Sequence, residues 1–304
     1  IKTRSHAGYN HVAVDAVRGV TKEIRPNLNT AEITTTNSFT SFDSDGFTLG
    51  ADSGDNYNKT SNTYVAWNWK AGGTGSANTD GSDNSTVSVN TTAGISIVKW
   101  TPSGSNATVG HGLGAVPECM LSFRLDGGQD RFVYHKDIGN THYMKLSTTD
   151  AKIDDANVWN DTTPTSSVFS VGSQFGGSDS VQYCFTSVKG FSKIGSYTGN
   201  GNADGAFIYT GFKPAFVLIK KATGSAKPWN IMDNKRLGYN PDNNVLNANA
   251  SDAEHTNNYI DILSNGIKII DTNQDVNNDN STYIYMAFAE APLVGSNNVP
   301  CTAR

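Results

Sequence analysis

The stretch STYIYMAFAEAP, residues 281–292, decides how the rest of the chain is interpreted. It is an alternating, aromatic-rich run that follows a cluster of Asn, Ser and Thr and ends in small residues. A second stretch of the same kind, NTYVAWNWKAGG, occupies residues 62–73. Recurrence over such a long interval is the sequence signature of an internal repeat. We therefore interpret both stretches as the last strand of a repeated unit.

Further matches support a repeat. Four residues near the start match four residues in the last third of the chain, each 218 positions further on: Ile1, Lys2, Asp15 and Arg18 with Ile219, Lys220, Asp233 and Arg236. A weaker copy lies between them, because ISIVKWTPSG (from Ile95) matches FSKIGSYTGNG (from Phe191). The period is then about 100 residues. We interpret the recurring Asp–Arg pair as an ion pair that stabilises the fold (a staple) and not as a catalytic pair.

The matches divide the chain into five parts. These are a truncated first repeat (residues 1–72), a flexible linker rich in Gly, Ser, Asn and Asp (73–94), a second repeat (95–190), a third repeat (191–293) and a C-terminal tail (294–304). The linker is predicted from composition. The first repeat has no counterpart of residues 191–217, so we expect upstream sequence or a neighbouring subunit to complete it.

Short period-2 runs bounded by turn residues fill the second and third repeats. Examples are ISIVKW, RFVYH and VQYCFTSV in the second and AFVLIKK and TYIYMAFA in the third. Spacing of this kind, with aromatic and β-branched enrichment, is typical of antiparallel sandwiches or barrels. The predicted fold is all-β, made of tandem antiparallel, jelly-roll-like β-sandwich repeats. Cys119 and Cys184 lie in such runs and are predicted to be buried thiols, with a disulfide between them as the alternative; Cys301 is expected to be exposed.

Composition limits the partners. The formal net charge is −5 and no basic block occurs, so no nucleic-acid partner is expected. No apolar run approaches the length that spans a bilayer, so no membrane insertion is expected. Hydrophobic residues make up 37% of the chain, and its 30 aromatic residues (13 Phe, 12 Tyr and 5 Trp) can still fill packed cores. We therefore expect a folded protein with no nucleic-acid partner and no membrane insertion.

Motifs for catalysis and metal binding are absent from the sequence. No HExxH, CxxC or GxSxG occurs, so we predict no catalytic residues, no metal site, no cofactor and no enzymatic activity. DSDG (residues 43–46) and NTDGSDN (78–84) resemble fragments of a calcium loop. The position that needs a bidentate Glu is Gly54, so the first fails as an EF-hand. Hairpin turns explain both stretches; a surface Ca²⁺ is the alternative.

Exposed aromatic rings with polar neighbours are the remaining candidates for a ligand site. Trp159 stands in the loop NVWNDTTPT with Asn157, Asn160 and Asp161 around it. Trp69 ends its strand beside Lys70. Aromatic faces flanked by amides and carboxylates suit sugars, and loops on a rigid sandwich commonly carry binding residues. We predict ligand contacts at Trp159, Asn157, Asn160, Asp161 and Trp69.

The motifs YVAWNWKAGG, VGHGLGAVP, SYTGNGNADGAFIYTGFKPAFVLIK and TYIYMAFAEAP resemble a repeat domain of tail-fibre-like and other structural proteins of bacteriophages, particularly marine ones, which often stands beside concanavalin-like lectin domains. The resemblance covers nearly the whole chain. The second repeat departs from it, since VQYCFTSV replaces the AFAE ending.

This resemblance implies a virion protein located in an extracellular particle. It would be a non-enzymatic segment of a tail fibre, knob or head decoration that serves as a spacer or a host-surface adhesin. Its partners would be other copies of itself, other virion proteins and a glycan of the host cell surface. The alternatives are a carbohydrate-binding module of a larger glycan-active protein and a host-side adhesin repeat.

Overall fold

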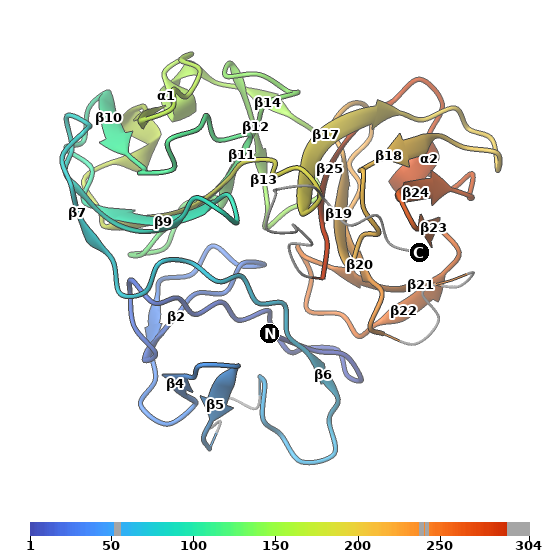
Figure 1. Cartoon of the computed structure of the whole chain (residues 1–304), viewed down its shortest axis with the longest axis horizontal. Coiled ribbons are helices and arrows are strands. Elements are labelled where there is room, and N and C mark those ends of the chain that lie inside the picture. The colour runs from blue at the N-terminus through green and yellow to red at the C-terminus, as the bar shows by residue number, and fades with distance from the viewer. Residues whose placement is uncertain (52–55, 237–239, 241–242, 291–304) are drawn as a thin grey trace.

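The computed structural model describes residues 1–51, 56–236, 240 and 243–290. Strands make up 38% of the described residues and helices 4%, which confirms the prediction of an all-β fold with antiparallel sheets. Figure 1 shows three lobes at the corners of a triangle. We call them the first segment (residues 1–72, blue), the middle body (76–185, cyan to yellow-green) and the third body (192–288, yellow to red).

The middle body is a sandwich of a long and a short sheet. Its strands are β7 (Ser76–Asn78), β8 (Ser85–Asn90), β9 (Ile95–Trp100), β10 (Ala107–Gly110), β11 (Cys119–Arg124), β12 (Phe132–His135), β13 (His142–Lys145), β14 (Ile153–Asp154), β15 (Val168–Val171) and β16 (Ser180–Phe185). The long sheet has the order β14-β13-β12-β11-β16-β9-β8-β7, and β10 pairs with β15. The short helix α1 (Ala156–Trp159) and the 3₁₀ turn η1 (Ser173–Phe175) complete it.

The third body is a second sandwich. Its elements are β17 (Ser192–Thr198), β18 (Phe207–Tyr209), β19 (Phe216–Lys221), β20 (Trp229–Asp233), β21 (Asn243–Asn247), β22 (His255–Asn257), β23 (Ile260–Leu263), β24 (Gly266–Ile269), α2 (Gln274–Asn277) and β25 (Thr282–Phe288). The six-stranded sheet has the order β17-β25-β19-β20-β21-β22, and the three-stranded sheet has the order β18-β24-β23.

The two sandwiches share a strand order. From one edge inward, β14-β13-β12-β11-β16-β9 in the middle body corresponds to β22-β21-β20-β19-β25-β17 in the third body, and β10-β15 corresponds to β18-β24. Two copies of one unit would have this order. The duplication itself stays a prediction. Two features differ: the middle body has α1 where the third body has β23, and its long sheet continues past β9 with β8 and β7, which have no counterpart beyond β17.

The first segment consists of short strand pairs. Its strands are β1 (Lys2–Thr3), β2 (Lys22–Glu23), β3 (Ile33–Thr34), β4 (Phe39–Phe42), β5 (Phe47–Leu49) and β6 (Tyr64–Val65). The pairs β1-β6, β2-β3 and β4-β5 correspond to β19-β25, β21-β22 and β23-β24. An isolated bridge between Ala13 and Ile24 likewise corresponds to the pairing of Ile231 with Leu246.

The prediction of a linker over residues 73–94 is wrong for most of that range. β7 and β8 lie within it, and β8 pairs along its whole length with β9. Polar residues are common there because the outermost strand β7 is mostly exposed and Thr86 of β8 is exposed, whereas Val87 and Ser88 are buried. Composition alone does not separate a polar edge strand from a linker.

The inner strands of both long sheets are buried on two faces. β25 shows this directly, because its side chains alternate between two hydrophobic cores. Ile284, Met286 and Phe288 enter a central core, whereas Tyr283, Tyr285 and Ala287 enter the interior of the third body. The middle body has its own interior core. The central core also takes residues from the middle body and, from the first segment, Ile24 with the partly buried Trp67 and Trp69. It is therefore shared by all three lobes.

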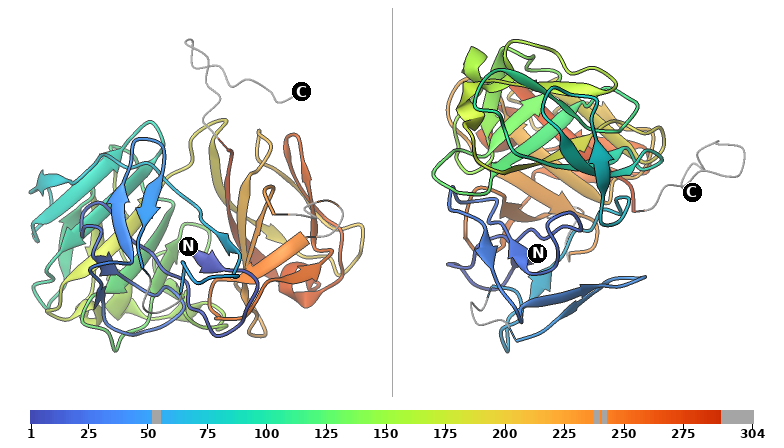
Figure 2. Two further views of the ribbon diagram at one scale, coloured as in Figure 1. Left: turned by 90° about the horizontal axis from the view of Figure 1, so that it is seen from below. Right: turned by 90° about the vertical axis from the view of Figure 1, so that its left-hand side faces the viewer.

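The lobes meet at three seams that use the same backbone contact. The amide of Glu32 donates to the carbonyl of Leu125 (2.8 Å), that of Lys152 to Ala222 (3.0 Å), and that of Glu254 to Arg4 (2.8 Å). The first segment thus contacts the middle body, the middle body contacts the third, and the third contacts the first. The three lobes form a closed ring, and Figure 2 shows the first segment lying against both other bodies.

A buried cation reinforces each seam. The Lys2 ammonium lies 3.5 Å from the carbonyl of Ser251, and the Lys220 ammonium donates to the carbonyl of Thr149 at 3.2 Å. At the third seam the Arg131 guanidinium donates to the carbonyls of Leu28 and Thr30. All three cationic residues are fully buried. They satisfy loop carbonyls that the seams remove from water.

The cysteine prediction is confirmed for two of the three residues. Cys119 and Cys184 are free and buried, and burial raises the pKa of both thiols. They act as small apolar side chains on opposite faces of the long sheet, since Cys119 belongs to the central core and Cys184 to the middle interior. Cys301 lies outside the described residues.

The packing of the three lobes around Trp69 predicts that Trp69→Ala strongly lowers the stability of the protein. The Trp69 ring makes edge contacts with Phe185 of the middle body and with Phe216 and Phe288 of the third. Removing it leaves a void where the three lobes meet, so we expect the free energy of unfolding in urea to fall by about 3 kcal/mol. Tyr209→Ala, at a side chain that is 64% exposed, is the control and should cost about 0.5 kcal/mol. Equal losses in the two variants would contradict this packing.

Candidate functional site

Trp159 is not a ligand platform, contrary to the sequence prediction. Its side chain is 1% exposed and packs against Tyr134 and Phe175 in the interior of the middle body. The cause is α1, which stands where the third body has β23 and directs Val158 and Trp159 inward. The polar neighbours in the sequence correctly indicated that the turn is exposed, but they did not indicate that the Trp159 side chain is buried.

The three polar residues beside Trp159 are exposed and shape the turn after α1. Asn160 and Asp161 have left-handed backbone conformations (φ 50° and 44°), which Asn and Asp tolerate better than most residues. The Asn160 side chain accepts a hydrogen bond from Asn106 (2.6 Å), and the Asp161 carbonyl accepts one from Asn140 (2.5 Å). Asn157 bonds to Asp155, the N-cap of α1. These contacts account for the residues without a ligand.

Trp69 is also placed differently from the prediction. It is half-buried and belongs to the packing of the central core. The two predicted aromatic residues therefore lie apart, Trp159 within the middle body and Trp69 where the lobes meet. The structure does not bring the predicted site residues together into one site.

An exposed aromatic surface lies elsewhere, on the third body. Phe207 and Tyr209 of β18 are 49% and 64% exposed, and Ile208 between them is buried. Their rings project from the outer face of the three-stranded sheet, at its edge strand. Gly266 lies opposite Tyr209 in the register. A Cβ on Gly266 would lie 2.2 Å from the carbonyl oxygen of Ile208 and 3.0 Å from the Phe207 ring, so only glycine allows β18 and the ring to lie this close. We call Phe207 and Tyr209 the outer aromatic surface.

Charged groups border the outer aromatic surface. Lys268 lies opposite Phe207 in β24, and Asp261 of β23 lies opposite Lys268, so the three side chains share one face of the sheet. The Lys268 ammonium donates to the Asp204 carboxylate at 2.5 Å and to the carbonyl of Gly205 at 2.6 Å. Flat rings beside carboxylates are a combination that can contact the apolar face and hydroxyl groups of a sugar. The alternation in AFIYT was the sequence signal for it.

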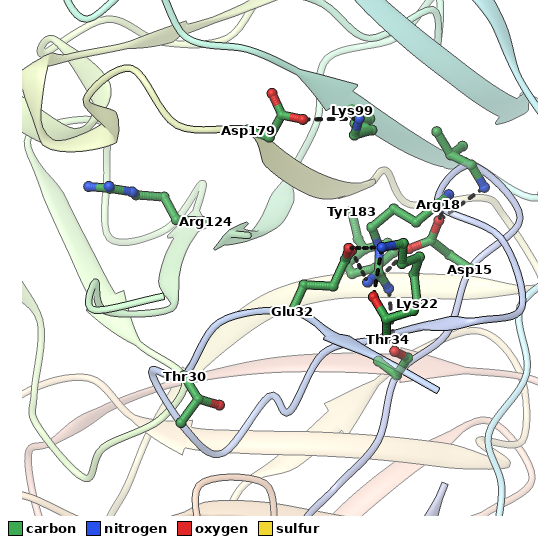
Figure 3. Close-up of polar contacts among 12 residues, drawn as sticks. Asp15, Arg18, Lys22, Thr30, Glu32, Thr34, Lys99, Arg124, Asp179 and Tyr183 are labelled. Carbon is green, nitrogen blue, oxygen red and sulfur yellow. Dashed lines mark hydrogen bonds and ion pairs between the residues drawn. The ribbon is translucent and has the colours of Figure 1, made fainter. Parts of the chain in front are cut away.

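A buried ion cluster joins the first segment to the middle body (Figure 3). The Arg18 guanidinium binds Asp15 at 2.6 Å and Glu32 at 3.0 Å. Tyr183 of β16 donates its hydroxyl to Asp15 at 2.8 Å, and burial together with the Asp15 carboxylate raises the pKa of that hydroxyl. Each charge has an opposite partner within the cluster, as buried charges require.

A second cluster of the same composition joins the third body to the first segment. Arg236 binds Asp233 at 2.7 Å and Glu254 at 2.9 Å. Trp67 donates its indole N–H to Asp233 at 3.1 Å, and Arg4 binds Glu254 at 2.8 Å. Burial opposes ionisation of Glu254, but hydrogen bonds from Arg4 and Arg236 prevail and lower its pKa. Both clusters act as seam contacts, in accord with the staple interpretation of the Asp–Arg pairs.

A small cavity lies where the middle and third bodies meet. Its volume is about 10 Å³, and it is lined by Cys119, His135, Leu218, Trp229, Ile284, Tyr285 and Met286. That is room for about one water molecule and far below the size of a ligand pocket. The His135 Nδ1 accepts from the amide of Asp137 at 3.2 Å, so its Nε2 carries the hydrogen and faces the carbonyl of Tyr285 at 3.4 Å.

Two further observations concern the part of the chain that the structure describes. No group of three or more His, Cys, Asp or Glu side chains in it is placed to hold a metal ion. None of its helices has the length and apolar character needed to cross a membrane. Residues 43–46 form the turn between β4 and β5, and the Asp43 amide donates to the carbonyl of Gly46 at 2.9 Å. This is the hairpin turn that the sequence predicted for DSDG.

Comparison with known proteins identifies a family. A domain of unknown function, DUF7483, matches residues 1–292. The chain belongs to the DUF7483 family. No curated protein and no solved structure matches it. The match runs through all three lobes, so the DUF7483 domain comprises the first segment, the middle body and the third body together.

The DUF7483 ring is predicted to lose stability in mild acid because of His135. Burial lowers the pKa of this imidazole from 6.5 to about 4, despite the nearby Asp137. Between these values the unfolded chain binds a proton at His135 that the folded chain does not, so the contribution of neutral His135 to stability is complete above pH 6.5 and falls as the pH decreases towards 4. At pH 5 the loss should be roughly 2 kcal/mol.

Urea unfolding at pH 7.5 and pH 5.0 measures this effect. The variant His135→Met removes the titrating group from β12 and leaves an uncharged apolar side chain in its place. We expect the wild-type protein to lose about 2 kcal/mol more than the variant on acidification. Equal losses in the two proteins would mean that folding does not lower the pKa of His135, which would contradict the prediction.

Proposed function

We propose that this protein is a non-enzymatic structural component of a bacteriophage particle. It would form part of a tail fibre, knob or head decoration and act as a spacer or as an adhesin on the host surface. Its partners would be other copies of itself or other particle proteins. The resemblance of the sequence motifs to those of tail-fibre-like proteins supports this assignment, and the family match leaves the role of the domain undefined.

The closed ring is the observation that carries the proposal. A spacer must transmit force without its domains moving apart. Three lobes that share one core and are joined by matching backbone contacts resist such movement, because no lobe can leave without opening two seams. The seam ion pairs are buried, which limits screening by salt in the surroundings of a particle.

The particle assignment is tested by locating the protein. Antibodies raised against the purified chain should label phage particles isolated from the source of this sequence, in electron micrographs, at a fixed position on the particle. Labelling of host cell fractions with no labelling of particles would contradict the proposal and favour a host-side adhesin.

A second role, carbohydrate binding, is favoured by the outer aromatic surface. Exposed apolar residues that cluster on one face of a soluble protein often mark a binding site. Phe207 and Tyr209 offer two ring faces two residues apart on one strand, with Asp204, Asp261 and Lys268 around them. This arrangement supports an adhesin that contacts host glycan through the third body.

Glycan binding gives a prediction that separates this role from the structural one. The purified chain should bind an array of bacterial surface polysaccharides without cleaving them. Tyr209→Ala and Phe207→Ala should each weaken binding about tenfold, corresponding to about 1.4 kcal/mol. Phe42→Ala, at another exposed aromatic residue but on the first segment, is the matched control and should bind normally. Unchanged binding in the Tyr209 and Phe207 variants would contradict the site, and turnover of a polysaccharide would contradict the non-enzymatic assignment.

A further inference from the structure

The first segment has an open strand edge where the other two lobes are closed. In the middle body β16 lies between β11 and β9, and in the third body β25 lies between β19 and β17. The corresponding strand of the first segment is β6, and among the described residues it pairs with β1 alone. The position that β9 and β17 fill in the other lobes is thus unoccupied by any described strand of this segment.

Side-chain burial agrees with this difference. Tyr64 and Val65 of β6 are only half-buried. Their counterparts in the third body, Tyr283 and Ile284, are at most 2% exposed, and Val181 at the start of β16 is fully buried. The same residue types in the same strand position are therefore partly exposed in the one lobe that lacks the flanking strand.

A second open edge lies on the adjoining hairpin. β24 of the third body lies between β23 and β18, whereas β5 of the first segment pairs with β4 alone among the described strands. Phe42 is 46% exposed, and Phe47 and Leu49 are half-buried, although their hairpin corresponds to one whose Ile260, Ile262, Ile267 and Ile269 are buried. The two open edges match the two strands β17 and β18, which are consecutive in the chain.

We propose that the first segment binds an extended polypeptide segment that adds two strands, one along β6 and one along β5. The other lobes specify its chemistry. β9–β10 and β17–β18 each supply a strand of six or seven residues, a turn-rich connection and a second short strand. The partner is therefore a segment of alternating apolar residues followed, after a Gly- and Asn-rich loop, by a short second strand.

Strand addition of this kind has a clear physical basis. Main-chain hydrogen bonds to an open edge supply affinity, and pockets for alternate side chains supply specificity. Here the strand along β6 would direct one set of side chains to the central core, as Ile194 of β17 does, and the other set to the interior of the first segment, as Tyr197 does in the third body. Open edges that expose apolar residues are otherwise sites of aggregation. This inference does not depend on the proposed function.

A synthetic peptide of residues 191–211 is the probe, because it contains β17, the connecting loop and β18. We expect saturable binding to the full chain in fluorescence anisotropy. In hydrogen exchange, the bound peptide should slow exchange in residues 64–68 and 47–49 and leave the third body unchanged. The control peptide carries Lys193→Pro, because the Lys193 amide belongs to the alternate set that faces the ladder, whereas the Ile194 amide donates to Ser187. It loses a ladder donor and should bind at least tenfold more weakly.

Three outcomes would overturn the proposal. The first is the absence of binding at peptide concentrations up to the solubility limit. The second is binding that protects other residues. The third is a concentration-dependent self-association of the chain that protects residues 64–68 without peptide, which would make a second copy the occupant of this edge.

Discussion

The burial of the two long sheets on both faces is the constraint on which the rest of this structure depends. An inner strand of such a sheet has no solvated face, so most of its side chains are apolar on both sides and its backbone groups must be paired within the sheet. β25 meets this condition, since β17 and β19 pair with it on either side. The central core forms where one face of each of the three lobes packs against the other two.

The seams follow from this shared core. Bringing the lobes together buries loop carbonyls and strand ends, which are costly without partners. The chain solves this in the same way three times, with an amide from one lobe and a buried cation from another. Two of the seams also carry an Asp–Arg–Glu cluster. In the middle body, Lys136 and Glu118 form a salt bridge at 3.2 Å, and the strand register places His135 and Ile138 where the third body has Asp233 and Arg236.

Much of the fold could be predicted from the sequence, because the double burial leaves a strong signal. Runs such as VQYCF and YIYMAF are apolar on both faces, and the strands lie where these runs stand. The edge strands β7 and β8 could not be predicted, since their exposed face is polar and resembles a linker. The ring was also missed, because no local pattern states which lobes share a core.

The site was predicted less well than the fold. Trp159 was chosen for its polar neighbours, but its burial is set by α1, a turn of helix inserted in an otherwise β sandwich. Phe207 and Tyr209 were passed over, although the alternation around Ile208 places them on one face. Exposure of an aromatic ring depends on whether a second layer covers that face, and this is a tertiary property that a strand pattern alone does not specify.

The central claim is that the three lobes form one closed cooperative unit. Native-state hydrogen exchange at the seam amides of Glu32, Lys152 and Glu254 tests it most directly, because each amide reports the opening of one seam. We predict that all three exchange only through global unfolding, with the same opening free energy as amides in β16 and β25. Exchange at any one of them with a clearly smaller opening free energy would show that this seam opens on its own and would contradict the closed ring.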